Sequence, residues 1–187
     1  MIDLGNTFRR IGTVLRESGT PYMLVGSFAS SFYQALRGTQ DVDLVIAPDH
    51  DQFQGLLLHL KKYDYYADSY ALSAYREQSM FNAIDNETGW KIDFIFRKPR
   101  AYDKEAFRRR KETTFQGVSF FIATAEDVIL AKLEWAKMRE SHRQLEDASI
   151  VLKKNRELLD FQYMERWVKE LGIEIQFNSA CKAAGLH

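Results

Sequence analysis

One aspartate inside an apolar run limits what this chain can fold into more than any other feature of the sequence. Asp93 lies within Lys91-Ile92-Asp93-Phe94-Ile95-Phe96, whose β-branched and aromatic residues predict a buried strand. A lone carboxylate buried in such a strand costs several kcal/mol in desolvation. The fold must therefore place something beside Asp93 that offsets this cost.

Two more aspartates lie on another predicted strand. Asp41-Val42-Asp43-Leu44-Val45-Ile46 predicts a strand, and the alternation of strand side chains puts Asp41 and Asp43 on one face. If this strand neighbours the one that carries Asp93, three carboxylates converge, and their mutual repulsion favours a cation among them. Oxygen-rich sites of this kind suit Mg²⁺ or Mn²⁺. The alternative is that Asp41 ends a loop and that the pair is an ordinary cap, turn or solvated strand end.

A Gly-Ser pair precedes these strands. Gly26-Ser27 follows the predicted buried strand 22–25 and precedes a predicted helix over residues 28–36. Glycine lets the backbone approach a ligand closely, and the N–H groups at a helix start favour an anion such as phosphate. The alternative is an ordinary strand-to-helix turn in which Ser27 is the N-cap.

The remaining pattern predicts an α/β (α+β) fold in two parts. Hydrophobic periodicity predicts helices over 3–18 and 49–61 and hairpins over 79–96 and 111–122. Four further helices are expected at 125–139, 142–154, 160–171 and 174–183. We therefore expect a mixed sheet flanked by helices in a core of residues 1–123, followed by a C-terminal helical bundle over 124–187.

The composition excludes several classes of protein. The 187 residues include 26 Lys and Arg, 26 Asp and Glu, and one cysteine, Cys181. Zero net charge argues against indiscriminate coating of nucleic acid or membrane, and a single cysteine excludes internal disulfides and multi-cysteine zinc sites. The start of the sequence lacks signal-peptide features, and no window approaches the ~18 uncharged apolar residues of a membrane span. A cytoplasmic protein without a membrane partner is expected.

The balanced charge conceals one strongly basic segment. Residues 97–111 contain eight Lys and Arg against two acidic residues, a local net charge of +6, with Tyr102 and Phe107 among them. A groove for RNA or for a triphosphate has this composition, and so does a solvated loop. The sequence leaves both readings open.

The order strand, Gly-Ser, helix, Asp-x-Asp and a third Asp on a later strand resembles the signature of the polymerase-β-like nucleotidyltransferase superfamily. The resemblance covers residues 22–96, with Leu24-Val25-Gly26-Ser27-Phe28-Ala29 and the stretch 38–46 as its most characteristic parts. In particular the chain is similar to the small bacterial branch that includes AbiEii-type toxins and minimal nucleotidyltransferases.

The resemblance implies a role for each of the motif residues. Gly26 and Ser27 would bind the β- and γ-phosphates of a nucleoside triphosphate. Asp41 and Asp43 would coordinate two Mg²⁺ (or Mn²⁺) ions. Asp93 would ligate the catalytic metal and help to deprotonate the attacking hydroxyl.

The toxin-like branch also carries a lysine on one tail helix and an acidic residue on the next. By that similarity Lys132 would reach the triphosphate, and Asp147 would orient Lys132 or the substrate. The alternative for Asp147 is an i,i+4 surface pair with Arg143, which would stabilise a helix by a few tenths of a kcal/mol.

The resemblance implies transfer of a nucleoside monophosphate from an NTP to an acceptor hydroxyl, in a toxin with a cognate antitoxin. RNA such as tRNA, a protein hydroxyl and a small molecule stay open as acceptors, because the nucleotide half-site would be the same for all. A catalytically silent, antitoxin-like binding module of the same fold is the main alternative. A glycosyltransferase that uses Asp-x-Asp is another, but it leaves Gly26-Ser27 unexplained.

Overall fold

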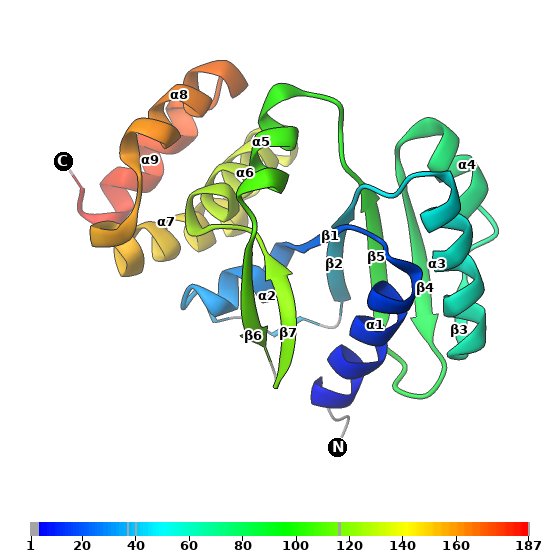
Figure 1. The fold of residues 1–187 in the computed structure, drawn as a ribbon. Helices are drawn as coiled ribbons and strands as arrows, with labels where there is room; N and C mark the ends of the chain where they lie inside the picture. The colour runs from blue at the N-terminus through cyan, green and yellow to red at the C-terminus, as the bar shows by residue number, and fades with distance from the viewer. Residues whose placement is uncertain (1–3, 37, 40, 116, 187) are drawn as a thin grey trace. The chain divides into compact units, whose positions relative to one another are not determined.

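The chain divides into two compact units. The computed structural model describes residues 4–36, 38–39, 41–115 and 117–186 (Figure 1). The first unit, here the sheet unit, comprises Met1–Val25 and Thr39–Ile122; the second, here the helical unit, comprises Gly26–Gly38 and Ala123–His187. Residues 26–38 thus group with the C-terminal helices.

The sheet unit contains a seven-stranded mixed sheet. Its order is β3-β4-β5-β2-β1-β7-β6, with β2 parallel to β5 and β1 parallel to β7. The strands are β1 (Tyr22–Leu24), β2 (Asp41–Ile46), β3 (Tyr65–Ala67), β4 (Met80–Asp85), β5 (Lys91–Phe96), β6 (Lys111–Phe115) and β7 (Val118–Ile122). The helices of this unit are α1 (Leu4–Ser18), α3 (His50–Lys62), α4 (Ala71–Glu77) and α5 (Ala101–Arg109).

Two of these helices, α1 and α3, cover one face of the sheet. The apolar stripe of α1 is buried, and a Cβ added to Gly12 would lie 3.1 Å from the Phe120 ring, so this helix approaches β7 closely. Phe53 of α3 packs on Phe81 and Phe96 of the same face. Asp49, the N-cap, and Gln52 form the capping box that starts α3.

The opposite face of the sheet is more open. Burial alternates along β2 and β4, so that even-numbered positions of β2 and odd-numbered positions of β4 are buried under the helices. The other positions are half-buried or exposed; Met80 and Ile84 of β4 are both exposed. The aspartates of β2 lie on this open face.

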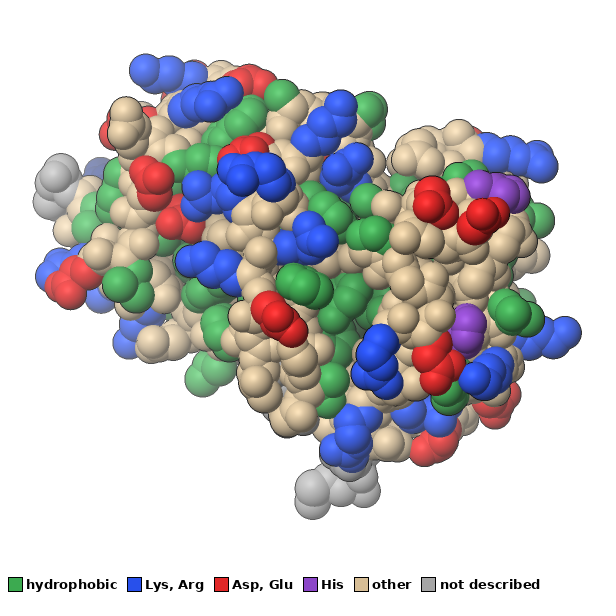
Figure 2. All heavy atoms as spheres, in the orientation of Figure 1, with side chains coloured by type: hydrophobic (Ala, Val, Ile, Leu, Met, Phe, Trp, Pro, Cys, Tyr) green, Lys and Arg blue, Asp and Glu red, His purple; other side chains and the backbone are tan. Residues whose placement is uncertain are grey.

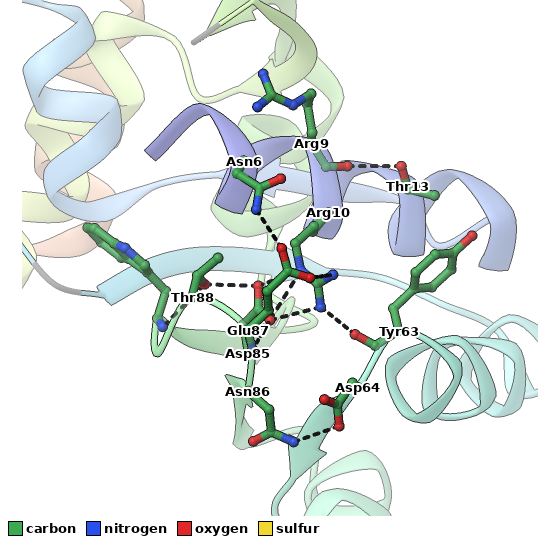
Figure 3. A network of polar contacts seen from close by, with 11 residues as sticks. Asn6, Arg9, Arg10, Thr13, Tyr63, Asp64, Asp85, Asn86, Glu87 and Thr88 are labelled. Atoms are coloured by element: carbon green, nitrogen blue, oxygen red, sulfur yellow. Dashed lines mark hydrogen bonds and ion pairs between the residues drawn. The ribbon is translucent and has the colours of Figure 1, made fainter. Parts of the chain in front are cut away.

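A buried ion pair fastens α1 to the hairpin of β4 and β5 (Figure 3). Asp85 is 0% exposed, and both of its oxygens accept hydrogen bonds from the Arg10 guanidinium at 2.9 Å. Arg10 also donates to Glu87 and to the Tyr63 carbonyl. The hydrogen bond to Asp85, although burial opposes it, raises the pKa of Arg10. This network joins the start of the chain to strands more than seventy residues later.

The helical unit is built from α2 and the C-terminal helices. Its elements are α2 (Gly26–Phe32), α6 (Ala125–Arg139), α7 (His142–Asn155), the 3₁₀ turn Arg156–Leu158, α8 (Phe161–Leu171) and α9 (Glu174–Ala184). Thr124 caps α6 by accepting from the Asp127 N–H at 3.3 Å. No helix among the described ranges has the length and apolar character needed to cross a bilayer.

Most predicted elements are confirmed within one or two residues, and the differences concern short segments. The helix expected at 28–36 begins at Gly26 and ends at Phe32, so Ser27 lies in its first turn and is not an N-cap. Neither β3 nor α4 is predicted from the sequence pattern, and the composition of the basic segment leaves a groove and a solvated loop open. Residues 101–109 of that segment form a helix, α5, whose buried residues are Tyr102, Ala106 and Phe107.

Candidate active site

The register of β2 and β5 brings the three predicted aspartates onto one face. Asp43 pairs with Asp93, and Asp41 pairs with Lys91, in a parallel ladder. Neighbouring strands lie about 4.8 Å apart, and side chains at i and i+2 share a face. Asp41, Asp43, Lys91 and Asp93 therefore form a square of three carboxylates and one ammonium on the open face.

Lys91 holds two of these carboxylates. Its Nζ lies 3.1 Å from Asp93 Oδ2 and 3.5 Å from Asp41 Oδ1. Burial lowers the pKa of Lys91, but the hydrogen bond to Asp93 and the charges of Asp93 and Asp41 outweigh burial and raise it overall. Lys91 thus stays protonated near neutral pH and provides the offsetting charge that Asp93 requires.

The second carboxylate oxygen of Asp93, Oδ1, does not accept the hydrogen bond from Lys91. The residue is 7% exposed, and its Oδ1 is buried without a hydrogen-bond partner among the residues that the structure describes. Asn82 of β4 is the register partner of Asp93 on its other side, and its own Oδ1 is also buried and unpartnered. A buried polar atom without a partner is costly, so this corner of the face is suited to a further donor or cation.

The carboxylates do not themselves make a preformed cation cage. Among the residues described, no group of three or more His, Cys, Asp or Glu side chains is arranged to hold a metal ion. The Lys91 ammonium already lies between Asp41 and Asp93, 3.5 Å and 3.1 Å from their nearest oxygens. An added cation would therefore displace Lys91 or bind beside it.

The Gly-Ser pair belongs to the helical unit. Gly26 has φ = +65°, the left-handed region that favours glycine, and it follows directly on Val25. In the sheet unit, the Val25 N–H donates to the Asp43 carbonyl at 3.0 Å, so β1 ends beside Asp43. Ser30 and Ser31 donate to the carbonyls of Gly26 and Ser27 at 2.9 Å and fix the first turn of α2.

Lys132 and Asp147 meet inside the helical unit. Lys132 Nζ lies 2.9 Å from Asp147 Oδ2 and 3.1 Å from Gln144 Oε1. Lys132 is 5% exposed and Asp147 is 2% exposed. Asp147 is therefore buried and does not lie on a solvated helix surface, where a surface pair with Arg143 would place it. It accepts a hydrogen bond from Lys132, and its role toward a triphosphate or substrate stays a prediction.

Three polar residues beside the predicted ones, two in the sheet unit and one in the helical unit, are not themselves predicted from the sequence. Lys91 precedes Asp93 by two positions in a predicted strand, so alternation alone would have placed it on the carboxylate face. Identifying Asn82 as the neighbour of Asp93 requires the register of the β4–β5 hairpin, which the sequence of the turn does not determine. Gln144 lies one helical turn before Asp147, and its role needed the packing of α6 on α7.

Comparison with known proteins bears on the fold. No protein-family model and no curated protein matches the sequence. A crystal structure of ANT(2'')-Ia in complex with adenylyl-2''-tobramycin is similar, with a TM-score of 0.59, 12% identity and coverage of 89% of this chain and 95% of that one. An antigenic nucleotidyltransferase-like protein from Paracoccidioides brasiliensis gives 0.56 and 15%, with coverage of 97% and 93%. These likenesses confirm the mixed α/β, nucleotidyltransferase-like fold and leave the AbiEii-type branch a prediction.

Proposed function

We propose that this chain, which has the fold of nucleotidyltransferases, is a metal-dependent nucleotidyltransferase that uses an NTP as donor. The observation that carries the proposal is the register that sets Asp43 beside Asp93 and Asp41 two positions away on the same face. The unpartnered, buried Oδ1 of Asp93 supports a bound cation, and carboxylate oxygens are the ligands that Mg²⁺ and Mn²⁺ prefer. Asp41, Asp43 and Asp93 would hold the metal ions.

The proposed reaction is an in-line displacement. The acceptor oxygen bonds to the α-phosphorus, the bond from that phosphorus to the bridging oxygen breaks, and pyrophosphate leaves. Divalent cations, when bound, stabilise the attacking and leaving oxygens of such a step. Asp93 accepts the proton of the acceptor hydroxyl. The carboxylates of Asp41 and Asp43 would hold the divalent cations.

The phosphate-binding residues belong to the proposal on the strength of the sequence resemblance. Gly26 and Ser27 would bind the β- and γ-phosphates, and Lys132, oriented by Asp147, would be a further positive group for the triphosphate. The same resemblance extends the proposal to a cytoplasmic toxin with a cognate antitoxin. Growth arrest on expression, relieved by Asp43→Asn, is the corresponding cellular observation.

The test of this function is binding-dependent stability. Asp43→Asn removes one metal ligand and its charge, so it is expected to abolish stabilisation by Mg²⁺ and NTP. A ligand at ~100 times its Kd stabilises the folded protein by about 2.7 kcal/mol, which thermal unfolding detects. Asp51→Asn, an exposed position in the first turn of α3, is the matched control and should keep the effect. Identical melting of wild type and Asp43→Asn with every NTP and metal tried would overturn the proposal.

The Lys91 ion pairs give a second, independent prediction. Lys91→Met removes the ammonium that competes for Asp41 and Asp93, so Mn²⁺ should bind roughly tenfold more tightly, a difference of about 1.4 kcal/mol. Titration followed by the electron paramagnetic resonance of free Mn²⁺ measures this without any turnover. Lys98→Met, an exposed position just after β5, is the control and should bind as wild type does.

The same ion pairs favour one alternative function. If a metal ion cannot displace Lys91, the chain is a catalytically silent module of this fold. The Lys91 ammonium then neutralises the carboxylates permanently. Weaker or unchanged Mn²⁺ binding in Lys91→Met, together with no release of pyrophosphate from any NTP, would support that alternative.

A further inference from the structure

Two arginines of the basic segment share one aromatic ring in the sheet unit. The Cζ atom of Arg110 lies 4.2 Å from the centroid of the Phe107 ring, and that of Arg97 lies 5.6 Å from the same centroid. Arg110 is also 5.0 Å from the centroid of Phe121. Both guanidinium groups therefore lie within cation–π distance of the same ring.

The charges of this pair are not neutralised by carboxylates. Elsewhere in the segment Arg100 pairs with Asp103 and Arg108 pairs with Glu105, at 2.5 and 2.6 Å. Arg97 and Arg110 have no acidic partner within the described part of the chain, and the Nε of each is buried without an acceptor. Arg110 Nη1 donates to the Phe107 carbonyl at 2.6 Å.

The local electrostatics favour an anion here. Burial lowers the pKa of Arg110, and the nearby charge of Arg97 lowers it further, while Tyr22 raises it. Two like charges that are partly desolvated and that keep unused donors are stabilised by an oxyanion, which a planar guanidinium binds in a bidentate manner.

The pair lies on the same side of β5 as the carboxylates. The Arg97 N–H donates to the Ile46 carbonyl at 2.9 Å and continues the β2–β5 ladder, so alternation puts Arg97 on the face of Asp93. Four strand residues span roughly 13 Å. An anion at Arg97 is therefore too far from Asp93 to be the phosphate undergoing transfer.

We propose that Arg97 and Arg110 bind a backbone phosphate of a single-stranded nucleic-acid acceptor whose reacting hydroxyl lies at the carboxylates. This inference rests on the proposed function and names the acceptor class. The surrounding cations suit a polyanion: Figure 2 shows Lys and Arg side chains gathered over α5, and Lys98, Lys104 and Lys111 extend the positive segment. Arg97, Arg110 and these lysines would repel a polycationic acceptor.

The test measures binding in the absence of metal and NTP. A fluorescently labelled single-stranded RNA of about ten nucleotides is titrated with protein in EDTA, and its anisotropy is followed at several salt concentrations. Arg110→Met is expected to weaken binding about tenfold and to reduce the slope of log K against log salt by about 0.7, the value for one phosphate contact on a single strand. Arg97→Met provides a second variant if Arg110→Met folds poorly.

The matched control is Arg108→Met, which removes the same charge from α5 at an exposed position that Glu105 already neutralises. It should bind RNA within about twofold of wild type, because only the general field changes. Equal weakening by Arg108→Met and Arg110→Met, or no RNA binding by wild type, overturns the proposal.

A second experiment distinguishes a site for the acceptor from a site for the donor triphosphate. Stabilisation by Mg²⁺ and ATP should be the same in Arg110→Met as in wild type; a parallel loss would assign the pair to the donor triphosphate and overturn the inference. If Asp43→Asn leaves nucleotide binding intact while Arg110→Met weakens RNA binding, the proposed catalytic function fails but the phosphate site stands.

Discussion

Replacing Arg10 with methionine is expected to destabilise the protein by about 3–5 kcal/mol, because it strands the carboxylate of Asp85 in the core. Asp85 is fully buried and takes two hydrogen bonds from Arg10 at 2.9 Å. Methionine keeps an unbranched side chain on α1, so most of the loss reflects the uncompensated charge. Such a loss is a large fraction of the 5–15 kcal/mol typical of a folded protein.

Urea unfolding followed by circular dichroism measures this effect. Arg9→Met changes the adjacent, exposed position of α1 and should alter the midpoint little. Arg10→Met combined with Asp85→Asn should recover part of the loss, because a neutral amide replaces the stranded charge. A loss below about 1 kcal/mol in Arg10→Met would contradict a buried, energetically important pair.

The second large effect is expected at Lys132. Lys132→Met leaves Asp147 without its ammonium partner in the interior of the helical unit, and the free energy of unfolding should fall by about 3–5 kcal/mol. The side chains of both residues are almost completely buried, so solvent cannot replace the lost interaction. Thermal unfolding monitored by circular dichroism gives the change directly.

Two further variants separate stability from catalysis. Lys153→Met removes an exposed lysine from α7 and should melt like wild type. Lys132→Met with Asp147→Asn should be more stable than Lys132→Met alone. If the double variant is stable yet fails to release pyrophosphate under conditions where wild type does, Lys132 acts on the triphosphate as well as in the core. Unchanged melting of Lys132→Met would refute the structural role.

The sequence was most informative where function imposes a pattern that packing alone would not choose. Asp41 and Asp43 alternate with buried Val42 and Leu44, and that alternation correctly predicted their shared face. Asp93 indicated a partner beside its strand because a buried aspartate in an apolar run needs a compensating group. The long amphipathic helices, α1 and α3, followed from hydrophobic periodicity.

What the sequence could not supply were pairings between distant residues. Nothing local links Arg10 to Asp85, since the pair forms only when α1 packs under the β4–β5 hairpin. The basic segment left a groove and a solvated loop open because its many charges obscure the short apolar stripe of α5. The contacts of Lys91 with Asp41 depend on the pairing of β5 with β2, which the sequence of β5 does not contain.

The parallel pairing of β1 with β7 has a consequence for folding during synthesis on the ribosome. Leu24 lies beside Ile122, so β1 emerges long before its outer neighbour and exposes an unsatisfied backbone edge in the meantime. The helical unit has the same delay, since its first segment, Gly26–Gly38, waits for residues after Ala123. Neither unit can be completed until at least part of the second half of the chain has been synthesised. Contacts between residues so distant in sequence form slowly, so the nascent chain needs protection from aggregation in the meantime.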